Sequence, residues 1–439
     1  MRGPRYRPGR NSSFKPDPPT QRPELPRSLL EPTLLDLSLL CSLLLRVKKH
    51  LIIPEDNVDE PNIDRAPRQL RDHTSRVEIG GQVESSGQGT TMASVGLNDE
   101  SGTLRLTAIV PARNAAATLG RCLDALLAQV SADDEVIVVD DYSTDETSEI
   151  ASRYDVNVIR LSSHQGVSAA RNRGAQLARA PVLFFVDADV VVAPGTVTRA
   201  HTMMSKPDVG AVIGSYDDDP GASSTISRFK NLAHHYFHQH SSAEAITFWG
   251  ACGLVRRESF FALGGFNEYR RLSIEDVELG YALAAQGFQI ILDRDLQVKH
   301  LKKWTLWSMI VTDVVRRAIP WTLLCLEHQQ LPNKLNLSTE QRVAAIVTLA
   351  ITLVSTIAIV QYRLWLVVAA LVSIALWLNI DLYRLFLRKG GLRLAVSGFF
   401  LQQLYYLYAM FGLVAGLTVY FTKGFMQRRQ ATLNEIEHD

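Results

Sequence analysis

The chain has 439 residues, with 46 Lys and Arg against 45 Asp and Glu, and its formal net charge is +1. This length exceeds that of one hydrophobic core, so it excludes a miniprotein and predicts at least two structural units. The balanced charge indicates no nucleic acid partner. Four cysteines without a C-x-x-C pair indicate neither a zinc cluster nor a disulfide scaffold.

Residues 1–103 are expected to be an N-terminal arm and linker, largely disordered. Residues 1–32 are rich in Pro and Arg, a composition that buries too little apolar surface to offset the entropy of ordering the backbone. The apolar stretch Leu34–Leu45 is too short to span a bilayer, so we interpret it as an interfacial or docking helix. Gly80–Thr103 is dense in Gly, Ser and Thr and has the composition of a linker.

From Leu104 onward, short apolar segments alternate with amphipathic ones, which is typical of a parallel sheet with helices on both faces. Apolar spacing predicts a helix over 119–127, and Ser143–Glu146 has the pattern of a capping box that opens a second helix. We therefore predict an α/β, doubly wound, mostly parallel sheet over residues 104–303. Its expected strands are 104–110, 135–139, 157–161, 182–186 and 209–213.

The C-terminal third differs from the rest of the chain. It contains three uncharged apolar runs, each long enough to cross a bilayer core, and we expect about three transmembrane helices within residues 341–423. The runs are Val343–Val360, Leu364–Ile380 and Leu394–Phe421. Residues 304–340 mix Trp and aliphatic residues with Lys and Arg, which favours a membrane-interface segment. A polar tail, 424–439, follows.

The distribution of basic residues predicts the orientation in the membrane. The loop between the second and third runs has four basic residues, whereas the loop between the first and second has Arg363 alone. By the positive-inside rule the basic loop and the domain before the first run are cytoplasmic, so we expect a multi-pass protein of the cell (inner) membrane. Three spans would place Lys423, Arg428 and Arg429 outside, so the number of spans and the side of the tail stay open.

Three polar clusters follow predicted strands: Pro111–Asn114, Asp140–Ser143 and Asp187–Asp189. Each alone also fits a turn or a helix cap, but ligands of open α/β sheets bind at the carboxyl ends of the strands. Two neighbouring carboxylates repel each other unless a cation joins them. Mn²⁺ or Mg²⁺ suits such oxygen ligands and completes its shell with substrate phosphates.

These clusters belong to a longer series of motifs. Thr107–Asn114, Val138–Asp145, Gly166–Gly174, Val186–Asp189, Gly264–Glu268 and Ile274–Asp276 occur in this order. The series resembles the family 2 glycosyltransferases of the GT-A fold, in their membrane-anchored bacterial form, over about residues 104–305. The resemblance implies an inverting, hexosyltransferase-type enzyme that takes a sugar from a nucleotide diphosphate sugar, with a divalent metal on the diphosphate.

The resemblance also implies roles for single residues. Pro111, Arg113 and Asp141 would lie around the nucleotide, with Asp141 accepting a hydrogen bond from the base. Arg171 would lie close to the donor. Trp249 would offer a stacking face to the donor sugar or the acceptor, although packing in the core is an equal alternative.

The metal site would consist of Asp187 and Asp189 as the DxD pair, with Asp187 also on the donor side and Asp189 as the direct ligand. His300 is a candidate further ligand, because the resemblance includes GT-A enzymes in which a His at the end of a strand adds a ligand to the metal. His234 and His238 are one helical turn apart on Asn231–His240, but we favour a polar helix face there over a metal pair or an acceptor contact.

Glu275 and Asp276 resemble the ED motif of the family, in which Asp276 would be the general base and Glu275 its catalytic partner. A base within reach of the acceptor hydroxyl is what displacement at an anomeric carbon requires. The alternative is that both carboxylates merely favour the first turn of a helix through its dipole.

We therefore expect transfer to a membrane-proximal acceptor hydroxyl on a membrane lipid or a lipid-linked glycan. Two other functions stay open: a polyprenyl-phosphate glycosyltransferase, and a non-catalytic membrane scaffold. The Glu275–Asp276 pair argues against the first, because a phosphate nucleophile needs no base. Arg316–Trp321 differs from the Q-x-x-R-W motif of processive members, so processive synthesis is not favoured.

Overall fold

The computed structural model describes residues 105–268, 274–329 and 334–438, all within one compact unit of the chain, Ser86–Asp439. The predictions for the arm, for Leu34–Leu45 and for the linker Gly80–Thr103 lie outside the described residues.

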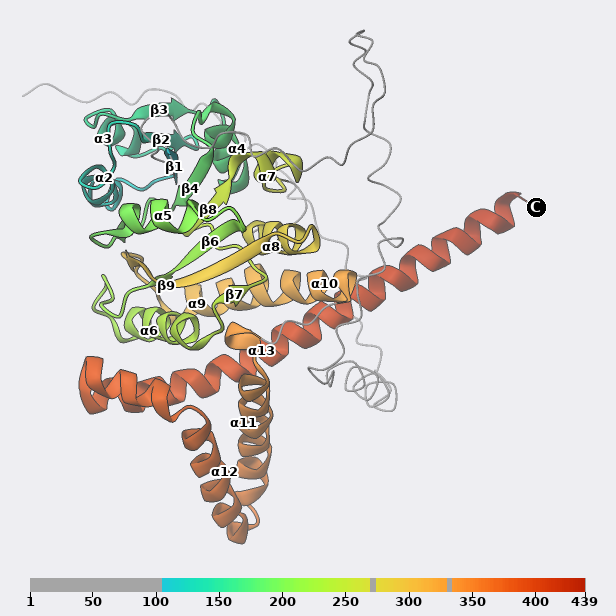
Figure 1. Cartoon of the computed structure of the whole chain (residues 1–439). Helices are drawn as coiled ribbons and strands as arrows, with labels where there is room; N and C mark the ends of the chain where they lie inside the picture. The colour runs from blue at the N-terminus through green and yellow to red at the C-terminus, as the bar shows by residue number, and fades with distance from the viewer. Residues whose placement is uncertain (1–104, 269–273, 330–333, 439) are drawn as a thin grey trace, which may run out of the picture. The chain divides into compact units, whose positions relative to one another are not determined.

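Within the described residues, nine strands form one mixed sheet in the order β3-β2-β1-β4-β8-β6-β9-β5, with β7 paired to β9 (Figure 1). Neighbours are parallel from β3 to β4, and also between β6 and β9, whereas β5, β7 and β8 are antiparallel to their neighbours. The α/β prediction is confirmed, and the five predicted strands correspond to β1–β4 and β6. The strands are β1 (Leu106–Ala112), β2 (Glu135–Asp140), β3 (Asn157–Arg160), β4 (Val182–Val186), β5 (Val190–Val192), β6 (Val209–Tyr216), β7 (Glu244–Ala245), β8 (Cys252–Arg256) and β9 (Gln289–His300).

Helices cover both faces of this sheet because successive strand residues point to opposite sides. In β1, Ala108 and Val110 enter one hydrophobic core while Ile109 enters the other. The first core packs against α2 (Leu119–Leu127), α3 (Thr147–Ala151) and α5 (Thr196–Met204). The second packs against α4 (Val167–Leu177), α7 (Arg257–Ala262) and α8 (Glu275–Ala285).

The helix over 119–127 is confirmed, but the predicted capping box is wrong. Ser143 does not cap α3, which begins only at Thr147, where the backbone N–H donates to Oδ1 of Asp145 at 3.1 Å. The Ser143 hydroxyl instead accepts a hydrogen bond from the backbone N–H of Asn114, at 3.0 Å, and so joins the loops after β1 and β2. The hydroxyl of Ser143 therefore bonds a residue distant in the sequence, Asn114, and not the first turn of the helix.

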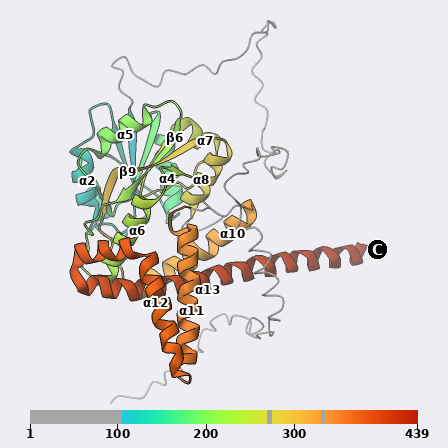
Figure 2. The same cartoon turned by 60° about the horizontal axis from the view of Figure 1, so that its bottom comes forward.

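The helix α6 (Thr225–His240) and the C-terminal helices complete the described fold. The C-terminal elements are α9 (Leu306–Val311), the π-helix η4 (Thr312–Ala318), α10 (Ile319–His328), η5 (Leu335–Leu337), α11 (Thr339–Ala358), η6 (Tyr362–Leu364), α12 (Trp365–Leu378) and α13 (Ile380–His438). Gly391, with φ 68° and ψ −171°, interrupts α13 and divides it into two helices. α11 and α12 lie side by side (Figure 2).

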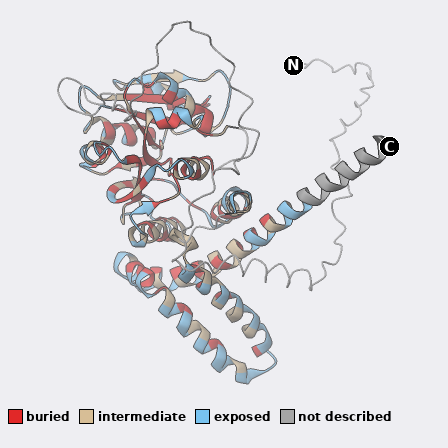
Figure 3. Ribbon diagram, turned by 45° about the vertical axis from the view of Figure 1, so that its right-hand side comes forward, coloured by how far each residue is buried: buried red, intermediate tan, exposed pale blue. Residues whose placement is uncertain are grey.

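The C-terminal helices present much apolar surface. Thr339–Ala358 and Ile380–Thr422 are long and apolar enough to cross a membrane, and Tyr362–Leu378 is a shorter apolar helix. Exposed residues predominate on α11 and α12, unlike in the sheet (Figure 3). Part of α13 is covered by α6, because Phe229 and Leu232 share a cluster with Leu382 and Phe386.

Candidate active site

The DxD pair lies where the sequence places it, directly after β4. Oδ1 of Asp187 accepts a hydrogen bond from Nη2 of Arg171 at 2.7 Å. Oδ2 of Asp189 lies 3.6 Å from Nε2 of His300, at the end of β9. The side chains of Asp187 and Asp189 are 33% and 32% exposed, so both are accessible to a ligand.

Arg171 connects this pair to the motif at the start of α8. Its side chain is buried in α4, and Nη1 donates to Oε1 of Glu275 at 2.8 Å. Burial alone would lower the pKa of Arg171, but Asp187 and Glu275 raise it, so the guanidinium stays charged. One cation therefore holds together two carboxylates that are 88 residues apart, Asp187 and Glu275.

Gly250 closes over the same guanidinium. A Cβ atom built at this position would lie 2.7 Å from Cζ of Arg171, so there is no room for a side chain. The backbone N–H of Gly250 donates to Oδ2 of Asp276 at 3.1 Å. The segment after Trp249 thus contacts both Arg171 and the predicted base.

Glu275 and Asp276 have different surroundings, although they are adjacent at the start of α8. Glu275 is 5% exposed, and burial together with the charge of Asp276 raises its pKa against the attraction of Arg171. Asp276 is partly exposed. Of the two carboxylates, the partly exposed Asp276 is the one open to an acceptor, and Glu275 is engaged with Arg171.

Asp189 and Asp187 also differ electrostatically. Desolvation raises the pKa of Asp189, but the hydrogen bond and charge of His300, with the charge of Lys302, lower it overall. Desolvation and the neighbouring charge of Asp189 raise the pKa of Asp187, despite Arg171. Asp189 is therefore the more readily ionised of the pair.

The predicted nucleotide end is organised by Asp141. Its carboxylate is 3% exposed and accepts from the backbone N–H groups of Gln165, at 2.7 Å, and Gly166, at 2.9 Å. His164 Nδ1 lies 2.7 Å from the same carboxylate, and its Nε2 lies 2.9 Å from Arg113. The structure brings Arg113 and Asp141 together through His164, with Asp141 anchoring the loop that leads into α4.

Pro111 lies within β1, where it pairs with Val139 of β2. Beyond the strand ends, Asn114 and Tyr142 have positive φ angles of 49° and 59°. Such angles are uncommon for residues other than glycine and concentrate at functional sites. The sequence reasoning missed Tyr142, whose side chain is 47% exposed beside the nucleotide end. A positive φ angle could not be predicted at this position, because tyrosine has no preference for the left-handed backbone conformation.

The histidines of α6 correct one expectation. His238 is 5% exposed, and its Nδ1 lies 3.0 Å from the carbonyl oxygen of Gly214 in β6. The ring of His234 lies 4.1 Å from that of His238 and 4.4 Å from that of Tyr216. The predicted polar helix face is wrong because this face packs on β6 and is not turned to solvent.

Trp249 joins the same aromatic cluster. Its ring lies 4.9 Å from Tyr216 and 5.0 Å from His234, and it remains partly exposed. Tyr216 in turn stacks on His300 at 4.5 Å with an interplanar angle of 10°. The cluster thus supports the imidazole beside Asp189 and leaves part of Trp249 available for contact.

A divalent metal fits these residues as an incomplete donor set. In the part of the chain that the structure describes, no three His, Cys, Asp or Glu side chains are grouped as a metal site. Two accessible carboxylates and a nearby imidazole are nevertheless the kind of set that Mg²⁺ or Mn²⁺ uses when substrate phosphates supply the remaining ligands.

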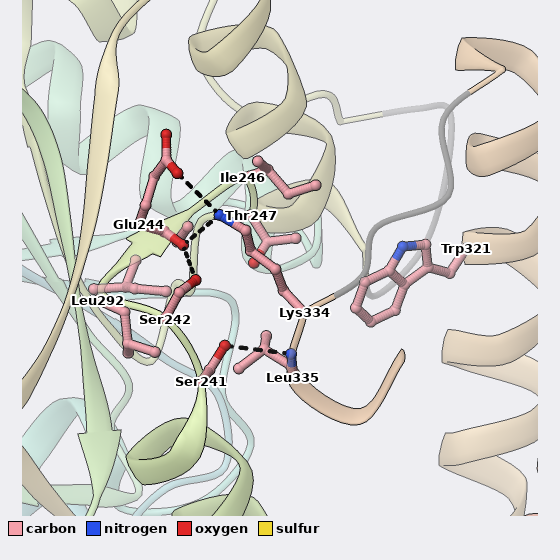
Figure 4. Close-up of a pocket in the computed structure, with 11 residues that line it drawn as sticks. Ser241, Ser242, Glu244, Ile246, Thr247, Leu292, Trp321, Lys334 and Leu335 are labelled. Carbon is pink, nitrogen blue, oxygen red and sulfur yellow. Dashed lines mark hydrogen bonds and ion pairs between the residues drawn. The ribbon is translucent and has the colours of Figure 1, made fainter. Parts of the chain in front are cut away.

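A separate pocket lies between the sheet and the C-terminal segment (Figure 4). Its lining includes Ser241, Ser242 and Leu335, and it holds an ion pair of 3.3 Å between Lys334 and Glu244. None of the predicted site residues lines this pocket. We therefore interpret it as part of the packing interface between the sheet and the C-terminal segment.

Residues 107–264 match the family model for glycosyl transferase family 2. This segment of the chain is similar to the family 2 glycosyltransferases. A validoxylamine A glucosyltransferase of Streptomyces hygroscopicus subsp. jinggangensis (strain 5008) is 30% identical over 227 residues, which cover 43% of this chain and 54% of the relative. The chain thus spans about half the length of these curated relatives.

A shorter but closer match is a PGL/p-HBAD biosynthesis glycosyltransferase of Mycobacterium bovis (strain BCG / Pasteur 1173P2), 42% identical over 86 residues, or 18% of this chain and 34% of the relative. Among solved structures, the mannosyltransferase PcManGT of Pyrobaculum calidifontis in complex with GDP-Man and Mn²⁺ is 19% identical. It aligns with 71% of this chain and 87% of its own, at a TM-score of 0.45.

Proposed function

We propose that the chain is a membrane-bound inverting glycosyltransferase, which moves a sugar from a nucleotide diphosphate sugar to a membrane-proximal acceptor hydroxyl. The observation that carries this proposal is the double contact of Arg171, with Asp187 at 2.7 Å and Glu275 at 2.8 Å. This contact links the Asp187–Asp189 pair to the Glu275–Asp276 pair and supports the proposal that both serve one site.

In this site Asp276 accepts the proton of the acceptor hydroxyl as its oxygen attacks the anomeric carbon and the bond to the diphosphate breaks. The N–H of Gly250 orients the Asp276 carboxylate, and Glu275 and Asp187 fix Arg171 beneath it. Arg171 positions Asp187 for the donor side. A divalent metal held by Asp189 and Asp187, with His300 adjacent, would neutralise charge on the leaving diphosphate.

We further propose a multi-pass location in the cell membrane with the family 2 domain on the cytoplasmic side. α11 has 20 residues, about 30 Å of helix, which matches the thickness of the hydrocarbon core. It forms a hairpin with α12, and the polar residues Gln361 and Arg363 lie at the tip. The packing of α13 against α6 supports a place for the basic segment before Gly391 on the same side as the catalytic domain, since Lys389 pairs with Asp218 at 2.5 Å.

The test is hydrolysis or transfer by the purified full-length chain with a panel of nucleotide sugars and Mn²⁺. We expect slow, metal-dependent release of nucleotide from one donor, and its loss in Asp189→Ala. Asp208→Ala, which changes a surface carboxylate outside the site, is the matched control and should keep the activity. No release from any donor would favour the non-catalytic scaffold instead.

The role of Asp276 is tested separately. Asp276→Asn keeps the size of the side chain and an oxygen for the Gly250 N–H, but removes the base, so we expect turnover to fall about 10³-fold. Donor binding, measured by thermal shift with Mn²⁺, should stay within about twofold of the native value, because Asp276 lies on the acceptor side. Near-normal turnover would exclude Asp276 as the base.

A further inference from the structure

Three cations gather where η4 and the segment after β9 meet α6. They are Lys230 of α6, Lys302 in the segment after β9, and Arg317 of η4. We call these three residues the cationic cluster. The charges of Lys302 and Arg317 both act against the positive charge of Lys230. The Nζ atoms of Lys302 and Lys230 lie close to one ring, that of Trp304. An anion bound among like charges offsets their repulsion and favours their charged forms.

Only one carboxylate is committed to the cluster. Nζ of Lys230 bonds both oxygens of Asp313 at 2.6 Å, and Asp313 also accepts from the hydroxyl of Tyr408 at 2.8 Å. Among the residues that the structure describes, neither Lys302 nor Arg317 has a carboxylate at ion-pair distance. The cluster therefore carries two positive charges in excess.

Trp304 supplies a second, independent observation. The centroid of its ring lies 4.5 Å from Nζ of Lys302 and 6.0 Å from Nζ of Lys230. The residue is 7% exposed, yet its indole Nε1 has no hydrogen-bond partner. A buried donor without an acceptor costs free energy, and the indole N–H can only donate. The missing partner is an acceptor, and the charges around it favour an anion.

The cluster adjoins the active site through Lys302, which follows His300 at the end of β9. Lys302 acts on Asp189, and Arg317 acts on Tyr216, which stacks on His300. Trp307 of α9 and Val315 of η4, near the cluster in the chain, are 74% and 57% exposed. An anion here would be close to the reacting groups while its apolar part faces exposed apolar side chains.

We propose that the cationic cluster binds the phosphate group of a membrane-borne lipid acceptor, with Trp304 Nε1 donating to a phosphate oxygen. This rests on the proposed function for the identity of the acceptor, but the binding itself needs no turnover. Arg317 and Lys302 hold the phosphate from solvent-accessible positions, and Lys230, held by Asp313, completes the positive field. η4 is a π-helix, a form that is frequent at functional sites.

The test uses the purified full-length chain in neutral detergent, with short-chain phosphatidic acid as the probe and thermal shift and tryptophan fluorescence as readouts. Each charge-assisted hydrogen bond contributes on the order of tenfold in affinity, so we expect Arg317→Gln and Lys302→Gln each to weaken binding about tenfold. Arg316→Gln and Lys303→Gln, neighbouring exposed cations, are the matched controls and should bind as the native chain does.

Further arms separate the sources of the phosphate. Diacylglycerol of the same chain length, which lacks the phosphate, should not bind. Inorganic phosphate that binds as tightly as phosphatidic acid would overturn the lipid assignment. Equal losses in the test and control variants, or no binding by the native chain, would overturn the site itself.

Nucleotide sugar binding is measured in parallel. If Lys302→Gln and Arg317→Gln weaken the donor and leave phosphatidic acid unaffected, the cluster belongs to the donor diphosphate and the inference fails while the proposed function stands. If the native chain binds phosphatidic acid but releases no sugar from any donor, the proposed function fails and the site stands.

Discussion

Every residue of β1, β4 and β6 is buried, whereas α11 buries only four of its described residues, and these include Gln341 and Thr348. In α12 the two buried residues are Val368 and Ala375, while Leu366 is 80% exposed. The catalytic domain encloses its large apolar side chains. The C-terminal hairpin turns them outward and packs through small and polar ones.

The difference is the one expected for two solvents, water around the sheet and lipid around the proposed membrane helices. Water drives large apolar side chains into a core, but lipid does not, and helices in a bilayer associate through small residues and hydrogen bonds. The hairpin and α13 share such a network. The hydroxyl of Tyr406 donates toward Gln341 at 2.7 Å and lies 3.0 Å from the side-chain oxygen of Asn379. All three side chains are buried.

The largest expected effect tests the hairpin directly. Ile346 and Leu353 are 65% and 57% exposed on α11, so in water their replacement by Lys would be nearly neutral. In a bilayer each central Lys costs about 3 kcal/mol, so the double variant Ile346→Lys with Leu353→Lys should lose about 6 kcal/mol of insertion free energy. We expect it to leave the membrane fraction after an alkaline wash.

Val360→Lys is the control for this experiment. Val360 is 84% exposed at the end of α11 near the hairpin tip, where a charge can reach water, so this variant should remain in the membrane. A double variant that stays in the membrane as firmly as the native chain would contradict the two-solvent comparison.

The next effect concerns the buried charges of the catalytic domain. Arg171→Met leaves Asp187 and Glu275 without their shared cation, and breaking a buried ion pair in this way destabilises a protein by about 3–5 kcal/mol. We expect a matching loss in urea unfolding of the full-length chain in detergent. Arg171→Lys, which retains the charge, should recover part of it.

The exposed pair Arg384–Asp381 of α13 provides the contrast, at 2.9 Å with both side chains more than half exposed. Arg384→Ala should change stability by less than about 1 kcal/mol. If Arg171→Met and Arg384→Ala lower the free energy of unfolding equally, the distinction between the buried charges around Arg171 and the exposed pair on α13 is wrong.

Much of the catalytic fold could be predicted from the sequence, because its strands and helices follow local apolar periodicity. The 119–127 helix and the β1–β4 and β6 strands are examples. β8 and β9 were missed: β8 pairs antiparallel with β4 and β6, and such pairing depends on distant partners that periodicity does not report.

The candidate site was predictable as residue types at strand ends but not as contacts. Motif order places Asp187, Asp189 and Asp276 near one edge of the sheet. The bridge from Arg171 to Glu275 spans 104 residues, and only the folded chain shows that it engages Glu275 and leaves Asp276 partly exposed. The α6 histidines were misread because their spacing does not show which neighbour covers them.

The smallest expected effect lies on α6, which packs against both regions. Burial, with the charges of His235 and Arg317, lowers the pKa of His238 from 6.5 to about 4, although its bond to Gly214 opposes the shift. Between these two pKa values the imidazole of His238 is protonated in the unfolded chain but not in the folded chain. The free energy of unfolding is therefore highest above pH 6.5 and falls as the pH drops toward 4. Between pH 7 and pH 5 this group should cost about 2 kcal/mol.

His238→Asn keeps a donor for the Gly214 carbonyl and cannot titrate, so its loss of stability between pH 7 and pH 5 should be about 2 kcal/mol smaller than that of the native chain. His240→Asn, on the exposed end of α6, is the control and should show the native pH dependence. Urea unfolding at several pH values measures the difference. If the free energy of unfolding depends on pH in the same way for all three proteins, His238 is accessible to water in the folded chain and is not buried against β6.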